Sequence, residues 1–370
     1  MRSIPSRTAG RETRTPCRIL SRKGLGDKTS APGRRPPGRR RADLYFCRCR
    51  RPASPFVRRG GLDGVAPSNG SRASFTFPHN LLQEKILHVR KEVPCSFLAG
   101  SGKSPAIFYS STMKPLNTSI YTFADLIEGG YLYVDKTEYI HQLVAPFKGQ
   151  YFIARPRRFG KSLLISTLKA LFQGRRELFE GLHILESTDF DWPVHPVIHL
   201  DLGSAQAVDG AELDRKLRDL LVYSAELHDI EIPPHAGDCS SAFLYLLNTL
   251  GRSGKRAVVL VDEYDKPILG NVDNQEKLPE ILRVLKAFYS VIKTTEAHQR
   301  FALLTGVSKF SKVSIFSDLN NLTDITLDAP FATMLGYTQA ELEENFAPHI
   351  DKLTETGGRQ RQELLDDIRD

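Results

Sequence analysis

The segment from Gly149 to Gly174 most constrains the fold, because it joins a strand pattern to a helix pattern through a short basic loop. "GQYFIA" (Gly149 to Ala154) is a β-prone apolar run of the kind that is buried between layers of helices. In the following "KSLLISTLKALFQG", apolar residues recur at helical spacing, and Gly174 is a typical helix stop. The loop ends in Gly160-Lys161-Ser162, which are the last three residues of the phosphate-binding pattern GxxxxGK[ST]. The segment therefore predicts a strand, a phosphate-binding loop and a helix, in that order.

The loop departs from the pattern at its first position, where Arg155 stands in place of glycine. Gly160 lets the backbone approach a phosphate, Lys161 reaches the β- and γ-oxygens, and the Ser162 hydroxyl is a ligand for Mg²⁺. The first glycine mainly serves the tight turn, which Pro156 can reshape by fixing its φ angle. The alternative is a solvated basic turn before an ordinary helix. The residues that we predict to bind ATP in this loop are Arg155, Arg157, Arg158, Phe159, Gly160, Lys161 and Ser162.

A second motif supplies the carboxylates that a Mg-nucleotide site needs. In "KRAVVLVDEYDKPIL", the aliphatic run from Ala257 to Val261 predicts a buried strand that ends at Asp262-Glu263. This is the Walker B arrangement, in which Asp262 binds Mg²⁺ and Glu263 polarises the attacking water. A buried strand that ends in acids is common by chance, but the two motifs also occur in the expected order, about 100 residues apart. Together they predict a site for ATP and Mg²⁺.

The remaining patterns predict an α/β fold. Strands alternate with helices, which implies a mainly parallel sheet covered on both faces, a three-layer αβα sandwich. We expect the strand order of the ASCE (additional strand, catalytic glutamate) class of P-loop NTPases. In that order the strand that ends at Thr305 lies between the two strands that carry the motifs. Ligands in such sheets bind beyond the carboxyl ends of the strands. The predicted strands are Val197 to Leu202, Phe301 to Thr305 and Leu322 to Leu327, and the predicted helices are Gly210 to Leu227, Ser241 to Leu250 and Leu278 to Thr295.

Thr305 is a candidate catalytic residue, because its strand is expected to end beside the two motifs. A hydroxyl at that point can contact the γ-phosphate or the attacking water, which is a sensor role. A plain strand-to-loop turn explains the same residues equally well.

The first 112 residues differ in composition from the rest of the chain. They hold 23 Lys and Arg against 6 Asp and Glu, a net charge of +17, whereas residues 113–370 hold 28 against 37, a net charge of −9. They also contain 11 of the 22 prolines, and apolar periodicity is almost absent. Because such a segment buries too little apolar surface to offset its ordering entropy, we expect a disordered basic extension.

Three interpretations of this extension stay open. The first is a nucleic-acid-binding arm, since arginine-rich tails attract phosphate backbones. The second is an organellar transit peptide, because such peptides are rich in Arg and Ser and poor in acidic residues. In the third interpretation, which we favour, it lies outside the folded protein and synthesis begins at Met113, where the composition changes. A second Gly-Lys-Ser within "AGSGKSPAIF" (Ala99 to Phe108) is followed by Pro105, which opens no good helix, so we expect no phosphate site there.

Hydropathy and cysteine usage exclude two classes of protein. No run of 18 or more apolar residues occurs, and the N-terminus lacks an apolar core of signal-peptide length, so we expect no membrane partner. Four of the five cysteines lie in the basic extension and only Cys239 lies beyond it, which leaves no disulfide framework. We therefore expect a cytoplasmic protein.

With these pieces in place, the chain from Met113 onward resembles the bacterial AAA-ATPase-like family of P-loop proteins, which often carry a C-terminal PD-(D/E)XK nuclease-like domain. In that family the form RPRRFGKS is normal, so Arg155 in place of glycine is a lineage trait. The resemblance rests on five dispersed blocks: "YLYVDKTEYIHQLV" (Tyr131 to Val144), "RPRRFGKSLL" (Arg155 to Leu164), "HPVIHLDL" (His195 to Leu202), "LVDEYDKPI" (Leu260 to Ile268) and "LLTGVSKFSKVSIFSDLNNLTDIT" (Leu303 to Thr326).

The resemblance implies an ATP-binding domain over residues 113–335, in which Lys161, Ser162 and Asp262 have their usual roles. It further implies that Asp135 and the adjacent Lys136 lie near the bound nucleotide. Read alone, "YLYVDKTEYI" predicts a short strand that runs into a helix capped near Asp135. We expect residues 336–370 to begin a helical region, and the nuclease-like part of the family is not recognisable in this chain.

These observations lead to a Mg-dependent ATPase that couples its nucleotide state to an unknown protein partner or to self-assembly. Lys161 and Mg²⁺ would neutralise charge in the transition state, and Glu263 would orient the water. Two alternatives remain: a nucleotide-binding switch that does not hydrolyse ATP, and a nucleic-acid-binding protein that depends on the basic extension.

Overall fold

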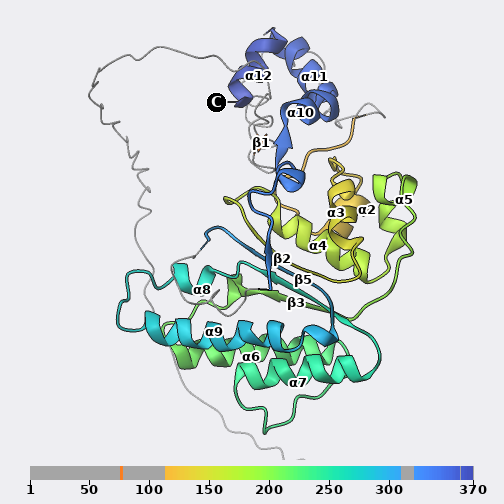
Figure 1. The fold of residues 1–370 in the computed structure, drawn as a ribbon. Helices are drawn as coiled ribbons and strands as arrows, with labels where there is room; N and C mark the ends of the chain where they lie inside the picture. The colour runs from red at the N-terminus through yellow and green to blue at the C-terminus, as the bar shows by residue number, and fades with distance from the viewer. Residues whose placement is uncertain (1–75, 78–112, 310–320, 359, 370) are drawn as a thin grey trace, which may run out of the picture. The chain divides into compact units, whose positions relative to one another are not determined.

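The computed structural model describes residues 76–77, 113–309, 321–358 and 360–369, all of which belong to the unit that spans residues 70–370. Its centre is a five-stranded sheet with the order β3-β4-β5-β2-β6, in which every neighbouring pair is parallel (Figure 1). β5 lies between the loop-bearing β2 and the acid-bearing β4, which confirms the predicted α/β class and strand order. The strands are β2 (Gly149–Ala154), β3 (Val197–Asp201), β4 (Ala257–Asp262), β5 (Gln299–Gly306) and β6 (Thr323–Asp324).

Helices cover both faces of the sheet, and alternate residues of each strand face opposite layers. In β4, Val259 and Val261 pack on one face, whereas Val258 and Leu260 pack on the other. This period of two, with helices on both sides, explains why all six residues of β4 are buried. The first face is covered by α6 (Gly210–Glu226), α7 (Cys239–Arg252) and α9 (Leu278–Thr294), and the second by α2 (Phe123–Glu128), α3 (Thr137–Val144), α4 (Lys161–Phe172) and α5 (His183–Glu186) (Figure 1).

Two of the longer helices, α6 and α7, begin where the sequence supplies an aspartate cap. Asp209 accepts a hydrogen bond from the Glu212 amide at the start of α6, and Asp238 accepts one from the Ser241 amide at the start of α7. These bonds satisfy amides that have no partner within the helix. Short helical turns fill the connections: η2 (Arg176–Phe179), η3 (Leu202–Ser204), α8 (Lys266–Leu269), η4 (Glu296–His298) and η5 (Ala329–Phe331).

Three further helices follow the sheet: α10 (Gln339–Asn345), α11 (Ala347–Gly357) and α12 (Arg361–Arg369). Their buried residues form a third apolar cluster, which also takes in Leu132 and Val134 from the segment before α3. A small antiparallel pair joins β1 (Thr76–Phe77) to β7 (Tyr337–Thr338). The C-terminal helices therefore pack on a segment that lies about 200 residues earlier in the chain.

The predicted elements agree with the structure except at two places. The segment before α3 is not a strand, because Leu132 and Val134 pack into the third cluster and no sheet neighbour pairs with them. The predicted strand Leu322 to Leu327 shrinks to the two residues of β6, since only Thr323 and Asp324 pair with β2. The predictions about the basic extension, its second Gly-Lys-Ser and the start at Met113 concern residues that lie outside the described ranges, apart from 76–77.

Candidate functional site

The loop after β2 leads directly into the N-terminus of α4. Gly160 is the residue before the helix and has a φ of 91°, a left-handed conformation that favours glycine. The first amides of an α-helix have no acceptor within the helix, and the helix dipole places partial positive charge at the same end. The turn at Gly160 thus presents the first turn of α4 as a site for an anion.

Lys161 begins α4, and its side chain folds back against the loop. Its Nζ donates hydrogen bonds to the carbonyl oxygens of Arg155, at 3.0 Å, and Pro156, at 2.9 Å. The residue is only 7% exposed, and burial lowers the pKa of its ammonium group, while the negative charge of Asp262 opposes this shift most strongly. The two motif residues therefore lie within electrostatic range of each other, although about 100 residues separate them in the sequence.

Arg155, at the position of the missing glycine, is tied to the chain that follows β6. Its guanidinium donates to the carbonyl oxygens of Thr326 and Ala332, and its backbone amide donates to the Gly306 carbonyl at 3.0 Å. Burial lowers the pKa of this guanidinium. In this structure the Arg155 side chain thus anchors the loop to residues 326–332.

The other predicted loop residues divide between solvent and core. Arg157 and Arg158 are exposed, and Arg158 has a φ of 69°, which is uncommon for an arginine. The Phe159 ring packs against the apolar cluster beneath α4, and its carbonyl accepts a hydrogen bond from the Gly336 amide at 3.1 Å. The loop is therefore fixed at both ends by residues 326–336.

The acidic end of β4 is tightly organised. Asp262 is 5% exposed, and its Oδ1 accepts hydrogen bonds from the Thr305 hydroxyl and, at 2.9 Å, from the Glu263 amide. Thr305 is fully buried and directs its proton at Asp262, so in this structure it positions that carboxylate. Glu263 has a φ of 50°, a strained conformation for a residue other than glycine, and such strain clusters at functional sites.

A cavity of about 370 Å³ brings the two motifs together. Ser162 lines it from the first turn of α4, and Asp262 and Glu263 line it from the end of β4. The volume is that of a small-molecule site. The other residues that line the cavity are Tyr121, Thr122, Ser166, Lys169, His199, Asp201 and Gly203.

Several of these lining residues were missed in the sequence, although two kinds of signal identify them. Ser166 lies one helical turn after Ser162, so it faces the same side of α4. Asp201 pairs in register with Asp262, so both carboxylates reach the same edge of the sheet. His199 lies on β3 two residues before Asp201, and burial, followed by the positive charge of Lys169, lowers its pKa, which favours the neutral imidazole.

The oxygen donors of the cavity fit Mg²⁺. This ion usually takes one or two protein oxygens and completes its shell with phosphate oxygens and waters. The Ser162 hydroxyl and the Asp262 carboxylate line the same space and supply donors of that kind. Over the described ranges, no group of three or more His, Cys, Asp or Glu side chains is arranged to hold a metal alone.

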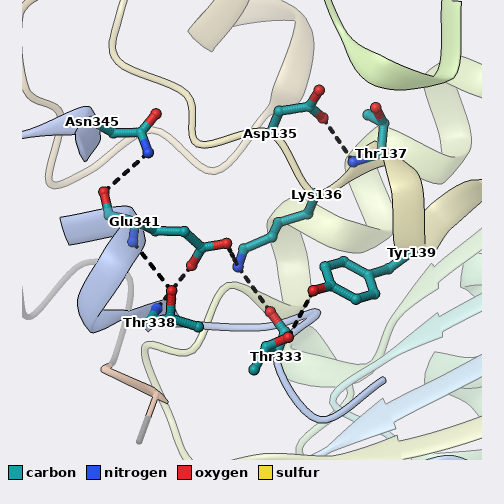
Figure 2. Close-up of polar contacts among 8 residues, drawn as sticks. All are labelled: Asp135, Lys136, Thr137, Tyr139, Thr333, Thr338, Glu341 and Asn345. Carbon is teal, nitrogen blue, oxygen red and sulfur yellow. Dashed lines mark hydrogen bonds and ion pairs between the residues drawn. The ribbon is translucent and has the colours of Figure 1, made fainter. Parts of the chain in front are cut away.

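Asp135 does not line this cavity. It has a capping role at the start of α3 (Figure 2). Its Oδ1 accepts a hydrogen bond from the Thr137 amide at the start of α3, and its Oδ2 accepts one from the His183 amide at the start of α5, both at 2.7 Å. The neighbouring Lys136 lines a separate cavity of about 30 Å³, together with Phe159 and Gly160 of the loop. Lys136 thus lies beside the loop, whereas the implied proximity of Asp135 and Lys136 to a bound nucleotide stays a prediction.

Comparison with known proteins identifies the family of the chain. Residues 117–316, more than half of the chain, match the AAA-ATPase-like family, described as predicted AAA-ATPase. An uncharacterised protein in the vnfD 5′ region of Azotobacter chroococcum mcd 1 is 43% identical over 242 residues, which are 65% of this chain and 46% of that protein. The chain thus spans about half the length of the curated relative that it matches.

A structural comparison gives a weaker likeness. The ORC2 protein of Aeropyrum pernix, solved as ADPNP-ADP complexes, is 13% identical, covers 69% of this chain and 56% of its own, and has a TM-score of 0.32. A likeness at this level carries no argument about the site. None of the helices in the described ranges is long and apolar enough to cross a bilayer. On the family match, the chain belongs to the AAA-ATPase-like family.

Proposed function

We propose that this protein binds ATP with Mg²⁺ at the cavity between α4 and β4 and hydrolyses it to ADP and phosphate. The observation that carries the proposal is that Ser162, Asp262 and Glu263 line one cavity at the N-terminus of a helix. Membership of the AAA-ATPase-like family independently supports a nucleotide-binding P-loop domain.

The phosphates would lie against the first turn of α4. Free amides and the helix dipole attract an anion there, and Lys161 adds a full positive charge. To reach a phosphate, the Lys161 ammonium would exchange its two loop carbonyl acceptors for phosphate oxygens, a stronger charge-assisted interaction. Ser162 and Asp262 would hold Mg²⁺, which supplies charge neutralisation on the phosphate oxygens.

Glu263 is the residue that we assign to the attacking water. It lines the cavity next to Asp262, and its strained backbone turns its carboxylate toward Gly203, which has no side chain to obstruct it. A carboxylate in this place can accept a hydrogen bond from water and orient its attack. Asp262 is held by Thr305 and is therefore preorganised for its role.

Steady-state ATP turnover by the full chain tests the proposal. Glu263→Gln should abolish most turnover and keep nucleotide affinity, because the amide accepts a proton poorly but has the same shape. Lys161→Ala should lose affinity, and Lys148→Ala, at a surface ion pair with Glu296, is the matched control. Turnover that survives both site variants would refute the assignment.

A nucleotide-binding switch without hydrolysis is the second candidate, and one observation favours it. Glu263 Oε2 lies 3.5 Å from Lys266 Nζ, so this ion pair competes with the hydrogen bond that the carboxylate would accept from the attacking water. In a switch, Glu263→Gln would leave the already negligible turnover unchanged, whereas ATP would still protect the fold against heat.

The cellular setting and partners are extensions of the same proposal. Cys239 is free and buried, which suits a reducing compartment such as the cytoplasm. Arg157 and Arg158 are exposed residues of the loop and are candidates for contacts with a protein partner or a second copy. Nucleic-acid binding by residues 1–112 predicts an affinity that falls steeply with salt and disappears when that segment is deleted.

A further inference from the structure

The loops that follow β4 and β5 are joined by a dense set of hydrogen bonds. The Tyr264 amide donates to the Thr305 carbonyl at 2.9 Å, and the Tyr264 hydroxyl donates to the Ser308 carbonyl at 2.6 Å. Asp265 Oδ2 accepts the amides of Val307 and Ser308 at 2.9 and 2.8 Å. The tip of β5 is therefore fixed to the residues that directly follow Asp262-Glu263.

Burial makes these bonds energetically important. Tyr264 is fully buried and Asp265 is 1% exposed. A buried carboxylate is costly unless hydrogen bonds compensate for its lost hydration, and bonds to a charged acceptor are the strong ones. Removing the Asp265 carboxylate would leave two amides of the β5 loop without their acceptors.

Packing restricts the same junction to one shape. A Cβ atom at Gly306 would lie 2.4 Å from the Tyr264 ring and 3.0 Å from Asp265 Oδ1. The Tyr264 ring cannot easily move away, because its hydroxyl is bonded to Ser308 and its ring meets Phe152 and Tyr289 edge-on. The glycine thus allows the two loops to approach this closely.

We propose that Asp265 is a positioning residue for the ATP hydrolysis proposed above, on which this inference rests. It holds the tip of β5 against the loop after β4, and so keeps the Thr305 hydroxyl on the Asp262 carboxylate beside Glu263. Asp265 itself does not line the cavity.

The test compares Asp265→Ala and Asp265→Asn with Asp238→Ala in the full chain. Asp238 caps α7 and does not line the cavity, so its loss costs stability without altering the site. For Asp265→Ala we expect kcat for ATP to fall about 10- to 100-fold while KM changes less than about twofold, as small misplacements of catalytic groups do. Asp265→Asn keeps an oxygen acceptor and should recover part of the kcat, whereas Asp238→Ala should keep it all.

Hydrogen exchange gives a readout that does not depend on activity. The amides of Val307 and Ser308 should exchange faster in Asp265→Ala than in the unaltered protein, and at an intermediate rate in Asp265→Asn. An unchanged kcat in Asp265→Ala, with turnover present in the unaltered protein, would overturn the inference alone, as would unchanged exchange at both amides. If the unaltered protein shows no turnover, the proposed function fails and this inference fails with it.

Discussion

Replacement of Lys136 by methionine tests the ion pair between Lys136, at the start of α3, and Glu341 of α10 (Figure 2). Lys136 Nζ donates to the Thr333 carbonyl at 2.8 Å and to Glu341 Oε1, and it lies 5.8 Å from the centre of the Tyr139 ring. Burial lowers the pKa of this lysine, whereas its bond to Glu341 raises it. Methionine keeps the apolar stem and removes the charge.

The expected loss of folding stability follows from the polar groups that Lys136→Met leaves without their partner. The Lys136 and Glu341 side chains are 11% and 22% exposed, so the variant strands a largely buried carboxylate and a carbonyl oxygen. Breaking a fully buried pair costs about 3–5 kcal/mol, and because some water reaches Glu341 we expect about 2–3 kcal/mol here. That corresponds to a fall in Tm of roughly 4–12 °C for a unit of this size.

Urea unfolding of the full chain measures this loss. Lys148→Met is the matched control, since the side chains of Lys148 and Glu296 are 28% and 51% exposed and such pairs contribute about 0–1 kcal/mol. Adding Glu341→Gln to Lys136→Met should recover stability, because glutamine keeps the capping-box bond to the Thr338 amide and removes the stranded charge. If Lys136→Met unfolds no more easily than Lys148→Met, the reasoning is wrong.

Three other predictions concern single side chains. Burial lowers the pKa of Lys161, and the protonated lysine is the form that binds phosphate. As the pH is raised, ATP affinity measured by calorimetry should therefore fall at a lower pH than the ordinary lysine pKa of 10.5. A fall in affinity with its midpoint at or above pH 10.5 would contradict this. Gly306→Ala should cost about 1–3 kcal/mol in thermal unfolding through overpacking against Tyr264, and an unchanged Tm would show that the junction adapts. Asp238→Ala should cost about 1 kcal/mol at neutral pH. Hydrogen bonds, first that of the Ser240 hydroxyl, lower the pKa of Asp238 to about 2. The stabilisation by Asp238 is therefore fully present above pH 3.8 and is lost as the pH falls through about 2. A difference in stability between Asp238→Ala and the unaltered protein that persisted below pH 2 would contradict this.

Much of the fold could be predicted because local patterns and tertiary packing agree. α4, α6 and α9 carry apolar residues at helical spacing, and β4 is a continuous aliphatic run, so each pattern is set by the faces that the element buries. The segment before α3 misled the prediction because its alternating apolar residues pack on the C-terminal helices instead of on a strand. Packing against distant elements is not visible in a local pattern.

The site was predictable to the extent that its residues lie in motifs. Ser162, Asp262 and Glu263 do share a cavity, because parallel strands bring their carboxyl ends to one edge. The orientations of Arg155 and Asp135 were not predictable, since the acceptors of Arg155 lie 171 and 177 residues away and one donor to Asp135 lies 48 residues away. A motif gives the place of a residue, but its hydrogen-bond partners come from the tertiary structure.

Calorimetric titration of the full chain with ATP, with and without Mg²⁺, tests the central claim most directly. We predict one site per chain, with an affinity that falls at least about tenfold in Lys161→Ala, since one charge-assisted bond is worth about 1.5–3 kcal/mol. In Asp262→Asn the gain in affinity that Mg²⁺ provides should largely disappear. ATP binding of equal affinity in the unaltered protein and both variants would contradict a nucleotide site between α4 and β4.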